Sequence, residues 1–149
     1  MKKSFVVAFL MMGLVFVSCN KDDDGGEVTT ETRLVGTWKL ISGLSAGEPD
    51  ELNDCDKQTI AVFKDDSTFS EEYHYTSGDS CLMSPTSGTW EITSEGKLKA
   101  NYNTTDGSDF ETELSDFEIS GNTLKVIYGT EGGEDSNTYL KPQHHRGKL

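Results

Sequence analysis

The stretch TFSEEYHY, Thr68–Tyr75, decides the fold class, because its side chains alternate in character from one residue to the next. The odd-numbered positions from 69 to 75 are mostly aromatic, whereas the even-numbered positions between them are Ser, Glu and His. Successive side chains of a β-strand point to opposite faces, so this alternation predicts a strand with one buried and one solvated face. The preceding KDDS, Lys64–Ser67, is typical of a tight turn, because aspartate side chains satisfy turn backbone.

Stretches of the same character continue in both directions from this strand, separated by short polar or glycine-containing turns. A long loop is predicted at Thr76–Ser87, and a change of phase near Ser115 and Asp116 predicts a β-bulge. No segment shows a convincing helical period. The predicted strands are Gly36–Ser42, Gln58–Lys64, Thr68–Tyr75, Gly88–Ser94, Lys97–Asn103, Phe110–Ser120, Asn122–Gly129 and Ser136–Lys141.

The series of strands predicts an all-β fold. About eight antiparallel strands joined in order favour an up-and-down barrel, which removes exposed sheet edges. The alternative is an immunoglobulin-like sandwich. Its cysteine–tryptophan–cysteine order is missing from this sequence, because Trp90 follows both Cys55 and Cys81.

One motif connects this pattern to a known family. LVGTWKL, Leu34–Leu40, resembles the Gly-x-Trp opening of the lipocalins, with Gly36 and Trp38 as the matching pair. In that family the tryptophan plugs one end of the barrel. The resemblance therefore implies that Trp38 closes one end of a lipocalin-like barrel.

Two later motifs extend the resemblance. FKDDSTF, Phe63–Phe69, and SGTWEI, Ser87–Ile92, look like stretches of bacterial lipocalin-like domains that follow lipoprotein signals. The resemblance runs from about Leu34 to Pro142. It implies a lipocalin-like domain at 34–142. The polar and basic residues that follow, 143–149, are predicted to be a disordered, frayed tail.

The N-terminus is typical of an export signal. Lys2 and Lys3 precede an apolar run, Phe5–Val17, that is shorter than the roughly 20 residues of a membrane-spanning helix. FVSC at 16–19 resembles the lipobox of bacterial lipoproteins, in which the cysteine receives a diacylglyceryl group and becomes the first mature residue. Residues 1–18 are therefore predicted to be a lipoprotein signal peptide, with Cys19 lipidated. The alternative is a plain secretory signal with an incidental cysteine.

Residues 19–33 are predicted to be an acidic, flexible tether. NKDDDGG, Asn20–Gly26, contains adjacent aspartates that stay solvated and glycines that add flexibility. KDDD, Lys21–Asp24, also resembles the signal that sends some Gram-negative lipoproteins to the outer face of the outer membrane. We expect a lipid-anchored protein on the outer membrane that faces the cell exterior.

Composition limits the class of partner and the number of domains. The formal net charge is −13, and no basic stripe is present, so nucleic acid is a poor candidate partner. The mature length suits one domain.

Two cysteines remain if Cys19 carries lipid. Cys55 and Cys81 are expected to form a disulfide, because an exported protein folds in an oxidising compartment. A loop of about 26 residues would then be closed, worth roughly 3.5 kcal/mol in the chain-entropy description. A metal or catalytic thiol is the alternative, but it lacks partners: the sequence has no CxxC, and His74 is the sole histidine within the predicted domain.

The barrel interior is the candidate binding site. It is either filled by side chains or holds one small ligand. Glu71 lies on the aromatic face of its strand, where it anchors a ligand or, more simply, is solvated near the mouth. The residues predicted to face inward are Trp38, Leu40, Ile60, Val62, Phe69, Tyr73, Trp90, Ile92, Leu98, Ala100, Tyr102, Phe110, Leu114, Leu124 and Val126, and the predicted ligand-binding residues are Trp38, Phe69, Glu71, Tyr73, Trp90 and Tyr102.

Two functions follow from these alternatives. In the first, a surface-anchored barrel binds a small lipophilic molecule. In the second, a filled barrel contacts an envelope protein, a glycan or a host molecule through its loops, which expose residues such as Leu82 and Met83. We expect neither an enzyme nor a cofactor, because the sequence contains no acid–base, nucleophile or metal-ligand constellation.

Overall fold

The computed structural model describes residues 28–103 and 110–143. A short helix, α1 (Thr30–Leu34), precedes the first strand, and one turn of 3-10 helix, η1 (Asp56–Gln58), precedes β3. The strands are β1 (Gly36–Ser45), β2 (Glu48–Pro49), β3 (Ile60–Phe63), β4 (Thr68–Ser77), β5 (Ser80–Ile92), β6 (Leu98–Asn103), β7 (Phe110–Ser120), β8 (Thr123–Gly129) and β9 (Asp135–Leu140).

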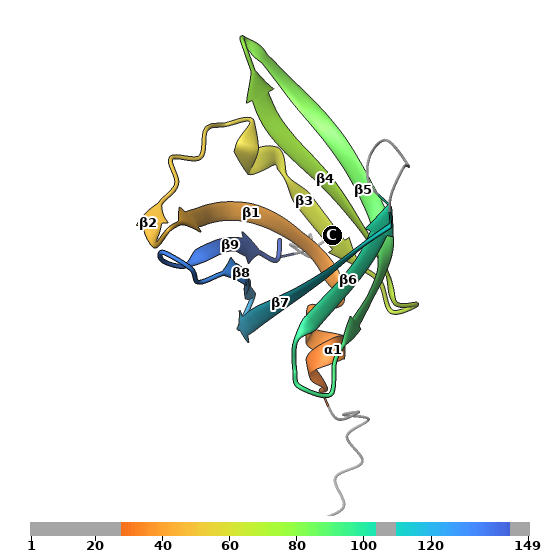
Figure 1. The fold of residues 1–149 in the computed structure, drawn as a ribbon. Helices are drawn as coiled ribbons and strands as arrows, with labels where there is room; N and C mark the ends of the chain where they lie inside the picture. Colours follow the sequence, from red (N-terminus) through yellow and green to blue (C-terminus); the bar gives the residue numbers. More distant parts are fainter. Residues whose placement is uncertain (1–27, 104–109, 144–149) are drawn as a thin grey trace, which may run out of the picture.

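These strands close into an antiparallel barrel (Figure 1). From β3 to β9 each strand pairs with the next, and β1 pairs with both β3 and β9. The closing ladder runs from Lys39 opposite Leu140 to Leu44 opposite Ser136. Eight strands form the barrel, and the two-residue β2 adds only to the end of β1. The predicted up-and-down barrel is confirmed, and the sandwich alternative is wrong.

The N-terminal boundary of the folded part lies slightly before the predicted one. Thr30–Leu34 belonged in part to the predicted tether, but it forms α1, whose N-cap Thr29 accepts a hydrogen bond from the backbone of Thr32. Leu34 is fully buried, so the helix packs onto the barrel. No helix among residues 28–103 and 110–143 is long and apolar enough to cross a membrane. The predicted signal peptide, Cys19 and most of the tether lie outside the described residues, as do residues 144–149 of the tail.

The predicted loop at Thr76–Ser87 is wrong. β4 and β5 form one long hairpin in which Thr76 pairs with Cys81 and Ser77 with Ser80. A turn at Gly78 and Asp79 connects them, with Gly78 at a φ of 61°, a conformation that glycine adopts without steric cost. The hairpin projects beyond the rest of the barrel at the top of Figure 1.

The predicted disulfide is confirmed and ties this hairpin to the preceding loop. Cys55 and Cys81 are bonded, with their Cα atoms 5.6 Å apart. Cys55 lies directly before η1, and the side chain of Asn53 donates a hydrogen bond to the hydroxyl of Thr76 (3.1 Å). Because Cys81 pairs with Thr76, one residue pair from the end of the ladder, the covalent bond fixes the hairpin near its turn to the segment that leads into β3.

The predicted bulge in β7 is also wrong. Ser115 pairs with Leu98 of β6, and the next residue, Asp116, pairs with Ile127 of β8. The strand changes its pairing partner from β6 to β8 at this point, and its side chains continue to alternate between the inner and outer faces of the barrel. The register shifts that the described ladders contain lie instead between Leu40 and Ser42 and after Ile127.

The phase of two strands differs from the prediction. In β3 the residues that face inward are Ala61 and Phe63, whereas Ile60 and Val62 are only half-buried. In β7 Leu114 is 51% exposed, so it faces outward. A one-residue change of phase moves every side chain of a strand to the other face, and a run of apolar residues such as IAVF does not specify that phase.

Candidate functional site

One end of the barrel is filled by side chains and covered by α1. Trp38 is fully buried, and its indole Nε1 donates a hydrogen bond to the backbone oxygen of Leu34 (2.7 Å). Lys141 Nζ lies 4.8 Å from the centre of the Trp38 ring and donates to the backbone oxygens of Arg33 and Val35. These contacts hold the helix on the barrel and close this end with the tryptophan ring. We call it the closed end.

The glycine of the Gly-x-Trp motif has a structural reason to be glycine. Gly36 has a φ of 140°, which residues with a side chain rarely adopt. A Cβ atom at this position would also collide with the side chain of Lys141. Gly36 therefore lets the Lys141 side chain reach Trp38 and the end of α1.

The second tryptophan belongs to the same closed end. Trp90 is 5% exposed, and its Nε1 donates to the backbone oxygen of Lys64 in the turn between β3 and β4 (3.1 Å). Its ring packs edge-on against Phe63, with centroids 5.7 Å apart. The indole N–H and the ring of Trp90 therefore both find their partners within the protein.

Above the closed end the barrel is hollow. A cavity of about 370 Å³ opens towards the other end, a size within the range of small-molecule sites. Its apolar floor consists of Ala61, Phe63, Phe69, Leu98, Ala100, Leu124 and Val126. These side chains come from β3, β4, β6 and β8, so the floor depends on closure of the barrel.

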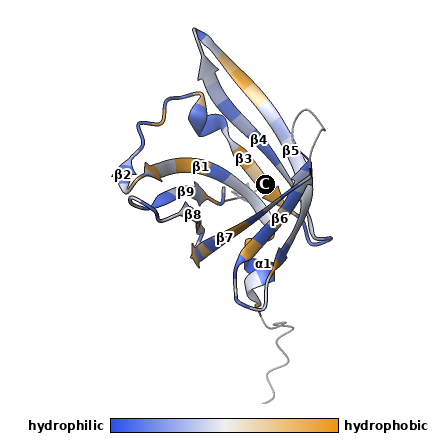
Figure 2. Cartoon of the chain, in the orientation of Figure 1, coloured by the Kyte–Doolittle hydropathy of each residue, from blue (hydrophilic) through white to orange (hydrophobic). Residues whose placement is uncertain are grey.

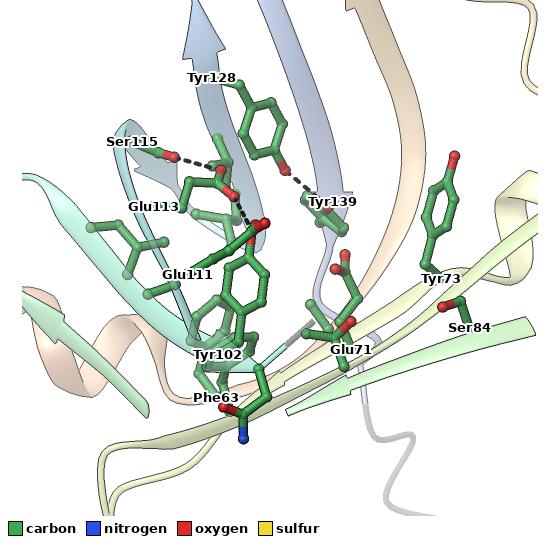
Figure 3. Close-up of a pocket in the computed structure, with 18 residues that line it drawn as sticks. Phe63, Glu71, Tyr73, Ser84, Tyr102, Glu111, Glu113, Ser115, Tyr128 and Tyr139 are labelled. Carbon is green, nitrogen blue, oxygen red and sulfur yellow. Dashed lines mark hydrogen bonds between the residues drawn. The ribbon is translucent and has the colours of Figure 1, made fainter. Parts of the chain in front are cut away.

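A band of polar side chains lies above this floor, and we call it the polar ring. Its members are Glu71, Tyr102, Glu113, Ser115, Tyr128 and Tyr139, all of which line the cavity (Figure 3). Glu113 accepts two hydrogen bonds, one from the Tyr102 hydroxyl (3.3 Å) and one from the Ser115 hydroxyl (3.0 Å). Both of its oxygens are thereby oriented by neighbours within the ring.

The other side of the polar ring is a pair of phenols. The hydroxyls of Tyr128 and Tyr139 lie 3.4 Å apart, and the side-chain amide of Asn137 donates to both at 3.5 Å. Loss of hydration at the hydroxyl raises the pKa of Tyr128 to about 12, although 45% of the residue is exposed, and burial raises the pKa of Tyr139 well above its usual range. Both phenols are therefore neutral at physiological pH and serve as hydrogen-bond donors and acceptors.

The carboxyl group of Glu71 has a raised pKa. Burial raises its pKa above the usual 4.5, and the negative charge of Glu113 raises it further, whereas a hydrogen-bonding contact with Tyr139 opposes the change. Loss of hydration disfavours the charged form of a carboxyl group, and a like charge nearby disfavours it again. Perturbation of this kind is characteristic of binding and catalytic sites.

The mouth of the cavity is more exposed than its floor. Tyr73, Ser84, Thr86, Asn103 and Glu111 line it. Tyr73 stacks on Tyr75, with ring centroids 5.9 Å apart. The mouth therefore continues the inner wall of the barrel onto the projecting β4–β5 hairpin.

Four of the six predicted ligand-binding residues line the cavity. These are Phe69 in the floor, Glu71 and Tyr102 in the polar ring, and Tyr73 at the mouth. Glu71 lies inside the cavity and not free in solvent at its mouth. Trp38 and Trp90 do not line it, because both are packed into the closed end. Their role as ligand contacts has no geometric support.

Sequence reasoning missed Glu113, Tyr128 and Tyr139. In β7 alternate residues share a face, so Ser115 and Glu113 lie on the same inner face as the half-buried Phe117. This alternation was the signal in the sequence that could have identified Glu113. The sequence analysis instead predicted that Leu114, which is exposed, faces inward. In β9, Tyr139 is 3% exposed whereas the more apolar Leu140 is 38% exposed, so hydropathy alone favours the wrong residue there.

Comparison with known proteins agrees with this architecture. A family model described as a lipocalin-like domain matches residues 34–126, which extend from the end of α1 through most of β8. A comparison with curated proteins finds no match to the chain. Lipocalin-like barrels are typically binding folds. The matched segment is more than half of the sequence and contains the Gly-x-Trp motif, both tryptophans of the closed end and the whole cavity floor, so the chain belongs to the lipocalin-like domain family.

Proposed function

We propose that this protein is a lipid-anchored lipoprotein of the outer membrane, facing the cell exterior, whose barrel binds a small lipophilic ligand. The observation that carries the binding part of the proposal is the cavity of about 370 Å³ with an apolar floor. A filled barrel of the same fold would have side chains in this space. The family match supports a binding role for the fold, and the cavity supplies a place for the ligand.

The floor and the polar ring contribute differently to ligand binding. Each 100 Å² of apolar ligand surface placed on the floor contributes about 2.5 kcal/mol. Buried polar groups of the ring instead select and orient a ligand, because an unmatched polar group is costly away from water. An amphiphilic molecule satisfies both parts of the cavity.

Native mass spectrometry of the chain purified from an oxidising compartment, followed by lipid extraction, tests the binding function. We expect a bound apolar molecule that is lost in Ala100→Trp, which fills the floor. Leu114→Trp is the matched control, because it adds the same ring to an outward-facing position. If added lipophilic probes bind Ala100→Trp and the parent equally, the cavity is not the site.

The anchor and its location rest on Cys19 and on Lys21–Asp24. We expect labelled palmitate to be incorporated into the parent chain and not into Cys19→Ser. Protease treatment of intact cells should degrade the parent and spare a variant in which Asp22–Asp24 are replaced by alanine. A parent chain that is protected in intact cells would contradict surface exposure.

A second candidate function is contact with an envelope protein, a glycan or a host molecule. The projecting hairpin exposes Leu82 (42%) and Met83 (50%), visible as an orange stretch of β5 in Figure 2. The filled barrel that accompanied this alternative is contradicted by the cavity. A double variant, Leu82→Ser with Met83→Ser, should lose such a partner and keep the small ligand, which separates the two functions.

A further inference from the structure

The charges that face the cavity are all of one sign. Glu71, Glu111 and Glu113 line it, whereas none of its described lining residues is Lys, Arg or His. Ion pairs elsewhere on the barrel show that its carboxylates find basic partners where these are within reach, for example Glu134 with Lys125 and Glu91 with Lys99. The carboxylates of the cavity lack such a partner among its described lining residues.

The position of these carboxylates is defined by the barrel. Glu113 is oriented by hydroxyls of Tyr102 and Ser115, and Glu71 approaches from the opposite wall, with Ala61 of β3 as its cross-strand neighbour. In Figure 3 Glu71 and Glu113 face the same space from different strands. Because the two groups repel each other across a partly desolvated cavity, a positive charge between them would relieve that repulsion.

Aromatic side chains complete the surroundings of that space. Tyr102, Tyr128 and Tyr139 contribute rings from β6, β8 and β9, and Tyr73 adds one at the mouth. The face of an aromatic ring attracts an organic cation, most strongly where water is excluded. Neutral phenol groups and carboxylates also accept the hydrogen bonds that an ammonium group donates.

We propose that the cavity binds an amphiphilic amine, with its ammonium group between Glu71 and Glu113 and its apolar part on the floor. This inference rests on the proposed binding function and specifies its ligand class. An anionic amphiphile such as a fatty acid would bring a third negative charge to these carboxylates. A metal ion is a poorer occupant, because no cluster of three or more His, Cys, Asp or Glu suited to a metal occurs within residues 28–103 and 110–143.

Calorimetric titration of the full chain with octylammonium, octanol and octanoate tests the proposal. The three probes share a chain and differ in charge. We expect octylammonium to bind at least about tenfold more tightly than octanoate, with octanol between them. Glu71→Gln should weaken octylammonium binding much more than octanol binding, because only octylammonium carries a charge. Glu72→Gln, which alters an exposed residue on the opposite face of β4, should change neither.

The outcomes separate the ligand class from the binding function. The amine proposal is overturned if octanoate binds as tightly as octylammonium, or if Glu71→Gln does not change the affinity for octylammonium. In either case the cavity remains a lipophilic site. No binding of any of the three overturns the amine proposal and the proposed function together. Glu113→Gln gives an independent test from the opposite wall, with the same expected loss for octylammonium.

The pH dependence provides a second readout. The titratable groups that face Glu71 in the cavity are Tyr73, Tyr102, Glu111, Glu113, Tyr128 and Tyr139. As the pH falls through the raised pKa of Glu71, its carboxylate is neutralised and octylammonium affinity should fall, whereas octanol affinity stays constant. An octylammonium affinity that is flat between neutral pH and pH 4.5 would count against Glu71 as the counter-charge.

Discussion

The two ends of the barrel are built from similar residue types but differ in what those residues contact. At the closed end Trp38 and Trp90 satisfy their indole N–H groups on backbone oxygens and pack against neighbours. At the open end Tyr102 and Tyr139 place their polar atoms around an empty space. Aromatic side chains therefore stabilise the fold where the barrel is filled, and they line a binding site where it is hollow.

The largest effect is expected from the closed end. Trp38→Ala should lower the free energy of unfolding by about 3–5 kcal/mol, because it removes a buried ring and leaves a cavity. Tyr73→Ala is the comparison at the open end, where half of the side chain is exposed, and it should cost no more than about 0.5 kcal/mol. Urea unfolding of both variants measures the difference. Equal losses would mean that the two ends do not differ in this way.

The disulfide should have the next largest effect. Replacing Cys55 and Cys81 by alanine removes a crosslink across a separation of 26 residues. The chain-entropy description gives a loss of roughly 3.5 kcal/mol. Ligand affinity should change little, because neither cysteine lines the cavity. A loss of binding in a variant that is still folded would show that the crosslink also shapes the mouth.

Lys141 should have a smaller effect, confined to the closed end. Lys141→Met keeps the aliphatic stem but loses two hydrogen bonds to backbone oxygens and the contact over Trp38. We expect a loss of about 1 kcal/mol. Lys39→Met, an exposed position on β1, is the matched control. Thermal unfolding that is equal in the two variants would show that the lysine does not hold α1 to the barrel.

Glu71 should have the smallest effect on stability, and one of opposite sign. Its pKa is raised in the folded chain, so the folded state favours the protonated form, and this contribution is lost as the pH rises. Glu71→Gln should therefore raise the melting temperature at neutral pH. The gain should vanish below pH 4.5, where Glu71 is also protonated in the unfolded chain. A gain that persists there would have another cause than ionisation.

The sequence was sufficient for the barrel and for part of its site. Alternation in Thr68–Tyr75 fixed the phase of β4, so Phe69, Glu71 and Tyr73 were correctly assigned to one face. In β3 alternation is lacking, because all four residues are apolar, and the phase was assigned one residue away from the true one. Phase can be predicted only where the two faces of a strand differ in polarity.

The polar ring was harder to predict because it breaks that rule. Glu113 and Ser115 point inward although they are polar, and Leu114 between them points outward. A hydropathy pattern assigns polar residues to solvent, so it misplaces a strand that lines a polar cavity. The two tryptophans, predicted as ligand contacts, lie at the closed end and do not line the cavity. Large aromatic side chains on the inner face suggest ligand contacts. Their indole N–H groups instead donate to the backbone oxygens of Leu34 and Lys64, and this pairing is visible only in the folded chain.

The central claim is that the hollow end binds a ligand and the closed end does not. The most direct measurement is a methyl and aromatic NMR titration with octanol, a neutral probe whose binding does not depend on the charge of the ring. We predict saturable shifts at Leu98, Ala100 and Val126, which line the floor, and none at Leu34. Shifts confined to Leu82 and Met83, or shifts that do not saturate, would contradict this account and favour a barrel that acts through its surface.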